Sequence, residues 1–272
     1  MKINKIIIVF LFFLTLSSCG RIEATNNTVN VKKIEVEDFT IASFQDALME
    51  AAEKAEQSVI ALVDSTALSN SLGSAVVTKR LAYKDGQIVD AIDDIDYFEY
   101  FAITNYHVIE KRGKLYTKVY LSGQTGDDKY TTTDVEIELF DKVVDIAVIR
   151  FRSTIYLPTA TLKNSNYLKK GQLVIAIGTP ASIDYYNTVT QGIISDPLRY
   201  VKESGGSNYY IQHDASINPG NSGGGLFNIE GKLVGINTWR YLEKGEEFIN
   251  LNFAIPTSII YNMCSEYIEN YA

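Results

Sequence analysis

The feature that most constrains the fold is a long series of short apolar runs, separated by turn residues and by no long helix. Most of the runs are bounded by Gly, Asn, Asp or Pro, the residues that favour turns. Many short strands without alternating helices predict an all-β sandwich or a pair of barrels, and not a parallel α/β sheet. The runs are Val59–Val63, Ser74–Val77, Tyr100–Thr104, Lys118–Leu121, Asp134–Leu139, Ile146–Phe151, Leu173–Ile177, Thr188–Ile194, Tyr209–Gln212, Gly224–Phe227, Leu233–Asn237 and Asn252–Ile255.

Two helices are expected, one at each end of this β region. Ser43 is a candidate helix cap, and apolar residues follow it at helical spacing as far as Ala55. This helix is predicted to end near Gln57. Pro256 suits a first helical turn, so Ser258–Tyr271 is predicted to form a closing helix.

The first residues have the pattern of an export signal. Lys2 and Lys5 precede the apolar run Ile6–Leu16, which is too short to span a bilayer comfortably. The small residues that follow lead to Cys19, and this arrangement resembles a bacterial lipobox, in which cleavage leaves a lipidated N-terminal cysteine. The alternatives are a plain signal peptide with an incidental cysteine and an uncleaved anchor.

The chain is accordingly divided into three parts. Residues 1–19 are predicted to be a lipoprotein signal peptide with its lipobox, residues 20–42 a tether, and residues 43–272 one folded domain. The protein is expected to be exported and lipid-anchored to the bacterial cell envelope, facing the periplasm or the exterior.

Charge and cysteine content narrow the partners. The 272 residues carry a formal net charge of −8, and this argues against nucleic acid as the main partner, because phosphate contacts need clustered Lys and Arg. If Cys19 carries lipid, Cys264 is the only other cysteine and no intrachain disulfide forms. Cys264 lies among apolar helix positions and is predicted to be a buried structural thiol.

The strongest local signal is the glycine-rich segment Asp214–Gly225, which surrounds Ser222. Glycines on both sides of a serine let successive N–H groups converge on one point, as an oxyanion hole requires. The candidate donors are the N–H groups of Gly220 and Ser222. An ordinary glycine-rich turn is the alternative; a phosphate-binding loop is not, since no Lys-Ser/Thr follows the glycines.

A serine nucleophile needs a base, and the chain has two histidines. His107 follows the strand Tyr100–Thr104, at a strand-to-turn junction where catalytic groups are commonly displayed. His213 alternates with Ile211 along a strand and fits a structural role. His107 is therefore the candidate general base.

The base needs a carboxylate that fixes its tautomer. Asp145 directly precedes the buried-looking run Ile146–Ile149, where an unpaired carboxylate would be costly. Asp141 is a competing candidate, and a turn-capping role is the alternative for Asp145. We prefer Asp145 because it abuts the apolar run.

Three segments together resemble the catalytic blocks of the HtrA/Deg group of trypsin-like peptidases, in that family's order. They are Thr104–Val108 around the histidine, Asp145–Val148 with the aspartate and Asn218–Gly224 with the serine. The resemblance covers roughly residues 47 to 268. It implies an all-β fold of two six-stranded β-barrels, with the site in the cleft between them and short N-terminal and C-terminal helices.

The resemblance also implies a function: a serine endopeptidase that hydrolyses peptide bonds through an acyl-enzyme, with polypeptide substrates such as unfolded or envelope proteins. No cofactor and no metal are expected. Members of the group often form trimers, so a homotrimer is possible, and often carry PDZ domains, none of which is predicted in this chain.

The specificity pocket departs from that of trypsin. The candidate lining residues are Ile217, Asn237 and Trp239, and none of them is acidic. Cleavage after Lys or Arg is therefore not expected, and small or medium apolar residues are the better prediction.

The stretch Lys79–Glu99 is longer and more acidic than the hairpin it replaces in the family. It is predicted to be a solvated hairpin tip, and a site for a cation or a basic partner is the alternative. Two other functions remain open for the whole chain. One is a catalytically silent trypsin-fold scaffold or binding module, and the other is an esterase, which would normally place its serine in an α/β fold.

Overall fold

The computed structural model describes residues 41–64, 71–90, 92–110, 115–120, 130–203, 206–243 and 246–272. Within it, residues Thr40–Ala272 form one compact unit. The predicted signal peptide and Cys19, with nearly all of the predicted tether, lie outside the described residues, so those assignments stay predictions.

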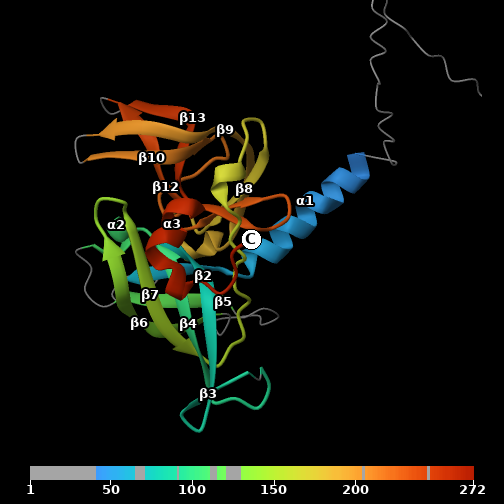
Figure 1. The fold of residues 1–272 in the computed structure, drawn as a ribbon, viewed down its shortest axis with the longest axis vertical. Helices are drawn as coiled ribbons and strands as arrows, with labels where there is room; N and C mark the ends of the chain where they lie inside the picture. Colours follow the sequence, from blue (N-terminus) through green and yellow to red (C-terminus); the bar gives the residue numbers. More distant parts are fainter. Residues whose placement is uncertain are drawn as a thin grey trace, which may run out of the picture. The chain divides into compact units, whose positions relative to one another are not determined.

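Seven strands form the first sheet (Figure 1). Their pairing order is β1-β5-β6-β7-β4-β2-β3, and β1 also pairs with β2. Six strands therefore pair in a closed ring, and the short β3 extends β2 as a hairpin. The bounds are β1 Val59–Asp64, β2 Ser71–Lys84, β3 Gln87–Val89, β4 Tyr97–Thr104, β5 Leu115–Tyr120, β6 Tyr130–Asp141 and β7 Ile146–Ser153.

The second half of the chain forms a closed six-stranded barrel in the order β10-β13-β12-β11-β8-β9. The prediction of an all-β fold with two six-stranded barrels is thus confirmed, with β3 as an addition to the first. The bounds are β8 Leu173–Gly178, β9 Thr188–Glu203, β10 Gly206–His213, β11 Gly225–Asn228, β12 Leu233–Glu243 and β13 Glu246–Pro256.

Helices occupy little of the described chain. They are α1 Ile41–Glu56, α2 Tyr106–Ile109 and α3 Thr257–Cys264, with 3₁₀ turns η2 Ser165–Tyr167, η3 Ile183–Tyr185 and η4 Ser265–Tyr267. No helix in the described part of the chain is long and apolar enough to cross a membrane.

The closing helix is shorter than the sequence predicts. It ends at Cys264, and after η4 the chain becomes extended at Ile268. The tail then bonds to Leu162, whose N–H donates to Asn270 O and whose carbonyl accepts the Ala272 N–H. Pairing with this neighbouring segment replaces the last helical turns.

One apolar core is shared by α1, α3 and both strand systems. Cys264 belongs to it and is fully buried, as predicted, and burial raises the pKa of its thiol to about 12. The buried members are Ala51, Ala55, Val59, Val76, Phe101, Ile103, Ile146, Val148, Ala160, Leu162, Ile175, Ile177, Tyr210, Phe227, Leu233, Ile236, Phe253, Ile255, Ile260 and Cys264.

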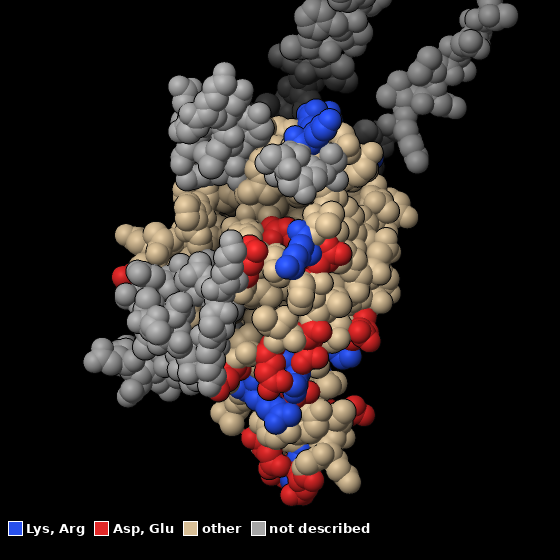
Figure 2. Space-filling model, turned by 90° about the vertical axis from the view of Figure 1, so that its left-hand side faces the viewer, with Lys and Arg blue, Asp and Glu red and all other residues tan. Residues whose placement is uncertain are grey.

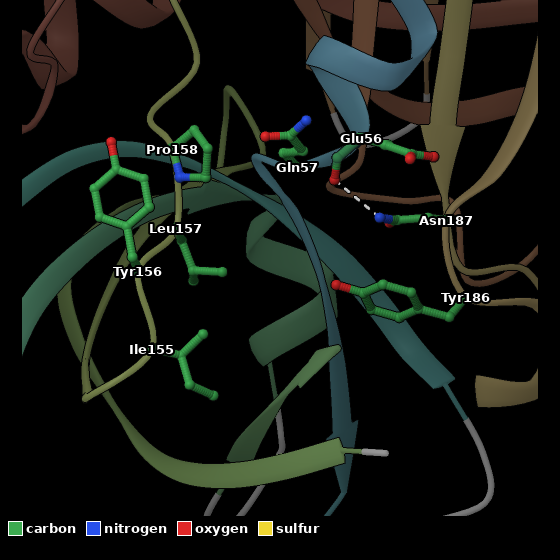
Figure 3. A pocket seen from close by; sticks show the side chains of 8 residues that line it. All are labelled: Glu56, Gln57, Ile155, Tyr156, Leu157, Pro158, Tyr186 and Asn187. Carbon is green, nitrogen blue, oxygen red and sulfur yellow. Dashed lines mark hydrogen bonds between the residues drawn. The ribbon is translucent and has the colours of Figure 1, made fainter. Parts of the chain in front are cut away.

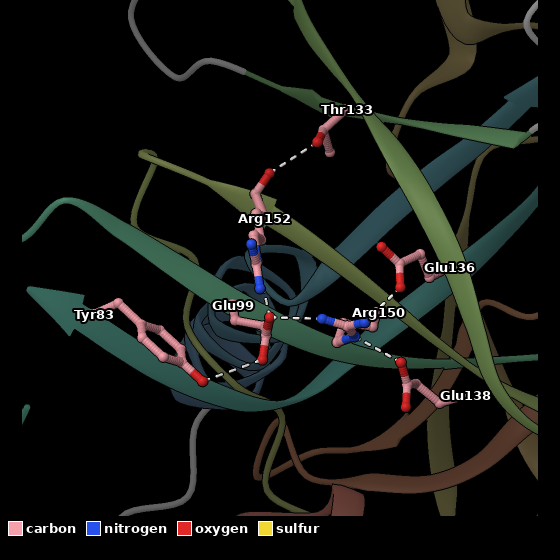
Figure 4. A network of polar contacts seen from close by, with 7 residues as sticks. All are labelled: Tyr83, Glu99, Thr133, Glu136, Glu138, Arg150 and Arg152. Carbon is pink, nitrogen blue, oxygen red and sulfur yellow. Dashed lines mark hydrogen bonds and ion pairs between the residues drawn. The ribbon is translucent and has the colours of Figure 1, made fainter. Parts of the chain in front are cut away.

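A network of ion pairs crosses strands β4, β7 and β6 (Figure 4). Glu99 is only 6% exposed and accepts hydrogen bonds from Arg150 at 2.8 Å and Arg152 at 2.9 Å. Arg150 also bonds to Glu136 and Glu138. The sequence placed Glu99 in a solvated acidic stretch, but its two arginines allow it to be buried. Figure 2 shows charged side chains of both signs gathered on the lower part of one face.

A pocket of about 430 Å³ lies where the C-terminal end of α1 meets the segment 155–158 and the residues that follow η3 (Figure 3). Asn187 Nδ2 donates to Glu56 O at 2.8 Å, and Tyr186 OH donates to Val59 O at 3.0 Å. These bonds attach the β8–β9 connection to α1 and β1.

Candidate active site

His107 and Asp145 are joined by two hydrogen bonds. The Nδ1 atom of His107 lies 2.8 Å from Asp145 Oδ2, and the His107 backbone N–H donates to Asp145 Oδ1 at 2.9 Å. His107 is carried by the single-turn helix α2, which follows β4, and Asp145 ends the turn before β7. The imidazole is 46% exposed, whereas the carboxylate is 23% exposed. The ring thus has one nitrogen on the carboxylate and the other available to a partner.

The structure also separates the two candidate aspartates. Asp141 Oδ1 accepts the N–H groups of Val143 and Val144, and so closes the turn. Asp145 has φ of +64°, a left-handed backbone that Asp tolerates better than most residues. Its carbonyl accepts bonds from the Tyr106 N–H and Asn105 Nδ2, which fix this conformation.

Thr238 connects this pair to Ser222. Its Oγ1 donates to Asp145 Oδ2 at 2.7 Å, while its carbonyl accepts the Ser222 hydroxyl at 2.9 Å. Sequence reasoning did not select Thr238 as a site residue. The signal that could have found it is its place directly after the predicted pocket residue Asn237. In the structure Thr238 lies within β12, at a bulge where the register with β13 shifts.

Ser222 therefore lies in one chain of hydrogen bonds with Thr238, Asp145 and His107. Among the described residues, no hydrogen bond joins the Ser222 hydroxyl to His107 itself. Hydrogen bonds between catalytic groups are often long or absent in a protein without substrate. Rotation about one side-chain bond would move the hydroxyl from its present acceptor.

The backbone before Ser222 turns sharply. Gly220 has φ of +102°, and a Cβ there would lie 2.4 Å from Thr179 O. Neither the Gly220 nor the Ser222 N–H donates to another described residue. Both N–H groups are thus able to donate hydrogen bonds to the negatively charged oxygen that develops when a serine attacks a carbonyl.

Ser74 fixes this turn from β2 and was also missed by sequence reasoning. Its hydroxyl donates to Gly220 O at 2.9 Å and accepts the Thr179 N–H at 2.9 Å. Ala181 N–H donates to Pro219 O at 2.8 Å. The loop before the serine is thus held by both strand systems.

The three predicted pocket residues are placed differently from one another. Ile217 is nearly buried in the interior of the second barrel. The amide of Asn237 is fully buried and donates to Gly225 O at 2.9 Å. Trp239 is half-buried and stacks on Phe253, with a ring-centroid distance of 4.2 Å. Their role in specificity stays a prediction.

His213 is fully buried at the end of β10. Burial lowers the pKa of its imidazole to about 4, and the nearby Asp214 carboxylate only partly offsets this effect. The ring is therefore neutral at pH 7. It is not part of the hydrogen-bond chain that contains Ser222.

Comparison with known proteins adds independent information. The family model described as "Trypsin-like peptidase domain" matches residues 86–236. The serine protease Do-like HtrB of Bacillus subtilis is 30% identical over 258 residues, which are 91% of this chain and 53% of that protein. The serine protease Do-like HtrA of Lactobacillus helveticus is 36% identical over 172 residues, 62% of this chain and 40% of that protein. The chain thus spans only about half the length of these curated relatives.

Solved structures agree with this comparison. A structure described as the HtrA-type protease AlgW with tripeptide has a TM-score of 0.61 and 29% sequence identity, and covers 82% of this chain and 64% of its own. A serine endoprotease from Yersinia pestis has a TM-score of 0.58 and 26% identity, and covers 81% of this chain and 66% of its own.

Proposed function

Because this chain belongs to the family of trypsin-like peptidase domains, we propose that it is a serine endopeptidase in which Ser222, His107 and Asp145 form the catalytic triad. The single observation that carries this proposal is the hydrogen-bond chain from Ser222 through Thr238 to Asp145 and His107. It connects three residues that are far apart in sequence, and the proposal requires that the Ser222 hydroxyl leave Thr238 O and bond to His107.

In the proposed reaction, the Ser222 hydroxyl turns from Thr238 O to His107 Nε2 and attacks the substrate carbonyl. His107 takes the proton, and Asp145 stabilises the imidazolium through the bond to Nδ1. His107 then returns the proton to the leaving amine, which departs and leaves an acyl-enzyme. Water activated by His107 attacks the ester, and the proton returns to Ser222 as the acid product leaves.

The N–H groups of Gly220 and Ser222 are proposed to hold the oxyanion. Donors fixed before the reaction stabilise the developing charge without reorganisation. The bond from Ser74 to Gly220 O supports this geometry, because it fixes the orientation of the loop backbone next to the nucleophile.

The test is cleavage of an unfolded protein, such as casein, by the full chain beside its Ser222→Ala variant. Removal of the nucleophilic serine of a triad lowers turnover by a factor on the order of 10⁶, so the variant is expected to be inactive. Activity that persists in the variant contradicts the assignment. Inactivity of both proteins would favour a catalytically silent scaffold, in which the Ser222 hydroxyl keeps its bond to Thr238 O.

The proposed setting is the bacterial cell envelope, with Cys19 lipidated, unfolded or envelope polypeptides as substrates, and a homotrimer as a possible assembly. The lipobox pattern supports the anchor, and relatives include a protein described as a probable periplasmic serine endoprotease DegP-like. Labelling of cells with a radioactive fatty acid, compared between the natural chain and Cys19→Ser, tests the anchor. Equal labelling of both would contradict it.

A further inference from the structure

The backbone next to Ser222 uses its successive N–H groups differently. The N–H groups of Gly220 and Ser222 donate to no other described residue, whereas the Asn221 N–H between them donates to Asn218 O at 2.9 Å. All three N–H groups belong to trans peptide units, in which the carbonyl oxygen and the N–H point in opposite directions. A contact that fixes one carbonyl of this segment therefore also sets where the N–H of the same unit points.

The carbonyls of the two outer peptide units are held by backbone donors. Pro219 O accepts the Ala181 N–H at 2.8 Å, and Asn221 O accepts the Gly224 N–H at 2.9 Å. These two units carry the two candidate oxyanion donors. Each donor is therefore held on the side opposite to a carbonyl that already has a partner.

Ser74 holds the middle peptide unit, which connects the two donors. Its hydroxyl donates to Gly220 O at 2.9 Å and accepts the Thr179 N–H at 2.9 Å. A carbonyl oxygen can only accept and an N–H can only donate, so the direction of both bonds is fixed. Ser74 is 0% exposed, and water therefore does not compete for these bonds.

The backbone of Ser74 is held as well. Its N–H donates to Ser222 O at 2.8 Å, and its carbonyl accepts the Thr104 hydroxyl at 2.7 Å. Thr104 is the last residue of β4, so this bond fixes Ser74 within the first strand system. From there Ser74 contacts the residues on both sides of Asn221 through separate hydrogen bonds.

We propose that Ser74 is a positioning residue for the oxyanion hole, which keeps the N–H groups of Gly220 and Ser222 directed at one point through its bond to Gly220 O. This inference rests on the proposed peptidase function and deepens it, because it assigns part of the transition-state stabilisation to a side chain outside the triad. The oxyanion forms only after the serine attacks, so the contribution of Ser74 falls on the chemical step and not on substrate binding.

The experiment compares steady-state cleavage of casein by the full chain, Ser74→Ala and Ser58→Ala. Loss of one oxyanion donor lowers kcat by a factor of about 10²–10³. Ser74→Ala loosens the donors without removing them, so kcat is expected to fall by about 10- to 100-fold while KM stays within about twofold. Ser58→Ala is the matched control, because the Ser58 hydroxyl is also buried and donates to a backbone carbonyl, that of Ala55, at 2.8 Å. The control is expected to keep the kcat of the natural chain.

A second measurement does not depend on which peptides the site accepts. In labelling with a fluorophosphonate, Ser222 Oγ attacks phosphorus, His107 takes the hydroxyl proton, and the P–F bond breaks as fluoride leaves. The phosphoryl oxygen takes the place of the oxyanion, so labelling of Ser74→Ala is expected to slow by a similar factor. Thermal unfolding shows whether each variant is folded at the assay temperature.

If Ser74→Ala does not fold, Ser74→Cys tests the same point, because a thiol of similar size donates only weakly and labelling should still slow. Unchanged kcat and labelling in a folded Ser74 variant overturn the inference and leave the peptidase in place. A loss that falls on KM, or an equal loss in Ser58→Ala, overturns it as well, since either would be a general effect of a missing buried bond. A natural chain that neither cleaves casein nor is labelled at Ser222 overturns both the inference and the proposed function.

Discussion

Both carboxylate oxygens of Asp145 are bonded to His107, one to the ring at 2.8 Å and one to the backbone N–H at 2.9 Å. The ring orientation is therefore set by the same group that would balance its positive charge. A third bond, from Thr238 Oγ1, fixes the carboxylate in turn.

Asp145→Asn is expected to lower kcat by a factor on the order of 10⁴, because an amide favours the wrong imidazole tautomer. Asn also tolerates the positive φ of this position, so the variant should fold. Turnover of a peptide and the thermal unfolding temperature are the measurements. Asp141→Asn is the control, because in the described part of the chain its carboxylate bonds only to N–H groups of the turn. An equal loss of turnover there would contradict the assignment.

Gly223→Ala is expected to prevent folding or to lower the free energy of unfolding by more than about 4 kcal/mol. Gly223 has φ of +83°, and a Cβ would lie 2.0 Å from Ser74 O and 2.2 Å from Thr104 Oγ1. Gly86 has a similar φ of +73° but nothing within 4 Å, so Gly86→Ala should cost only about 1–2 kcal/mol of backbone strain. Urea unfolding of both variants separates the cost of steric overlap from the cost of backbone strain. Equal losses in the free energy of unfolding would contradict the prediction, because they would mean that the structure around Gly223 shifts to accommodate the methyl group.

Glu99→Gln is expected to destabilise the protein at pH 7, because it removes the buried carboxylate that Arg152 pairs with and one of the three carboxylates around Arg150. Burial alone would raise the pKa of Glu99, but the hydrogen bonds and charges of Arg150 and Arg152 outweigh this and lower it from 4.5. The folded state therefore gains stability from this carboxylate above pH 4.5 and loses it as the pH falls through the lower folded pKa. Unfolding measured from pH 7 downward should show a weaker acid dependence in the variant. An unchanged pH profile would contradict this role.

His213→Gln is expected to flatten the stability profile at mildly acid pH. The unfolded imidazole binds a proton below its ordinary pKa of 6.5, whereas the buried one does so only near 4. The unfolded state thus binds more protons between these values, and stability falls as the pH drops from 6.5 to 4, by at most about 3 kcal/mol. Denaturant unfolding at several pH values checks this, and a natural chain with flat stability over that window would refute it.

Much of the architecture follows from pattern alone. Short apolar runs with turn residues between them were sufficient to predict every strand except the short β3, because a strand buries apolar side chains and a turn separates it from the next strand. The pairing of His107 with Asp145 also agrees with the sequence argument that a carboxylate abutting a buried run needs a partner. Asp141, which offered the same chemistry four residues earlier, serves the turn instead.

Other features depend on tertiary contacts that no local pattern records. The closing helix stops at Cys264 because the tail finds backbone partners at Leu162. Glu99 is buried because two arginines of the neighbouring strand reach it. Thr238 and Ser74 act through bonds to residues far away in sequence, so neither stood out in the sequence.

The core shared by both strand systems affects how readily one copy of the protein can be cleaved by another. Opening either barrel would strip apolar partners from the other, so the two are expected to unfold together. An active peptidase digests neighbouring copies when they open, at a rate set by the fraction of open molecules. Self-digestion of a concentrated preparation should therefore follow global unfolding, and the shared core makes the folded copies poor substrates for one another.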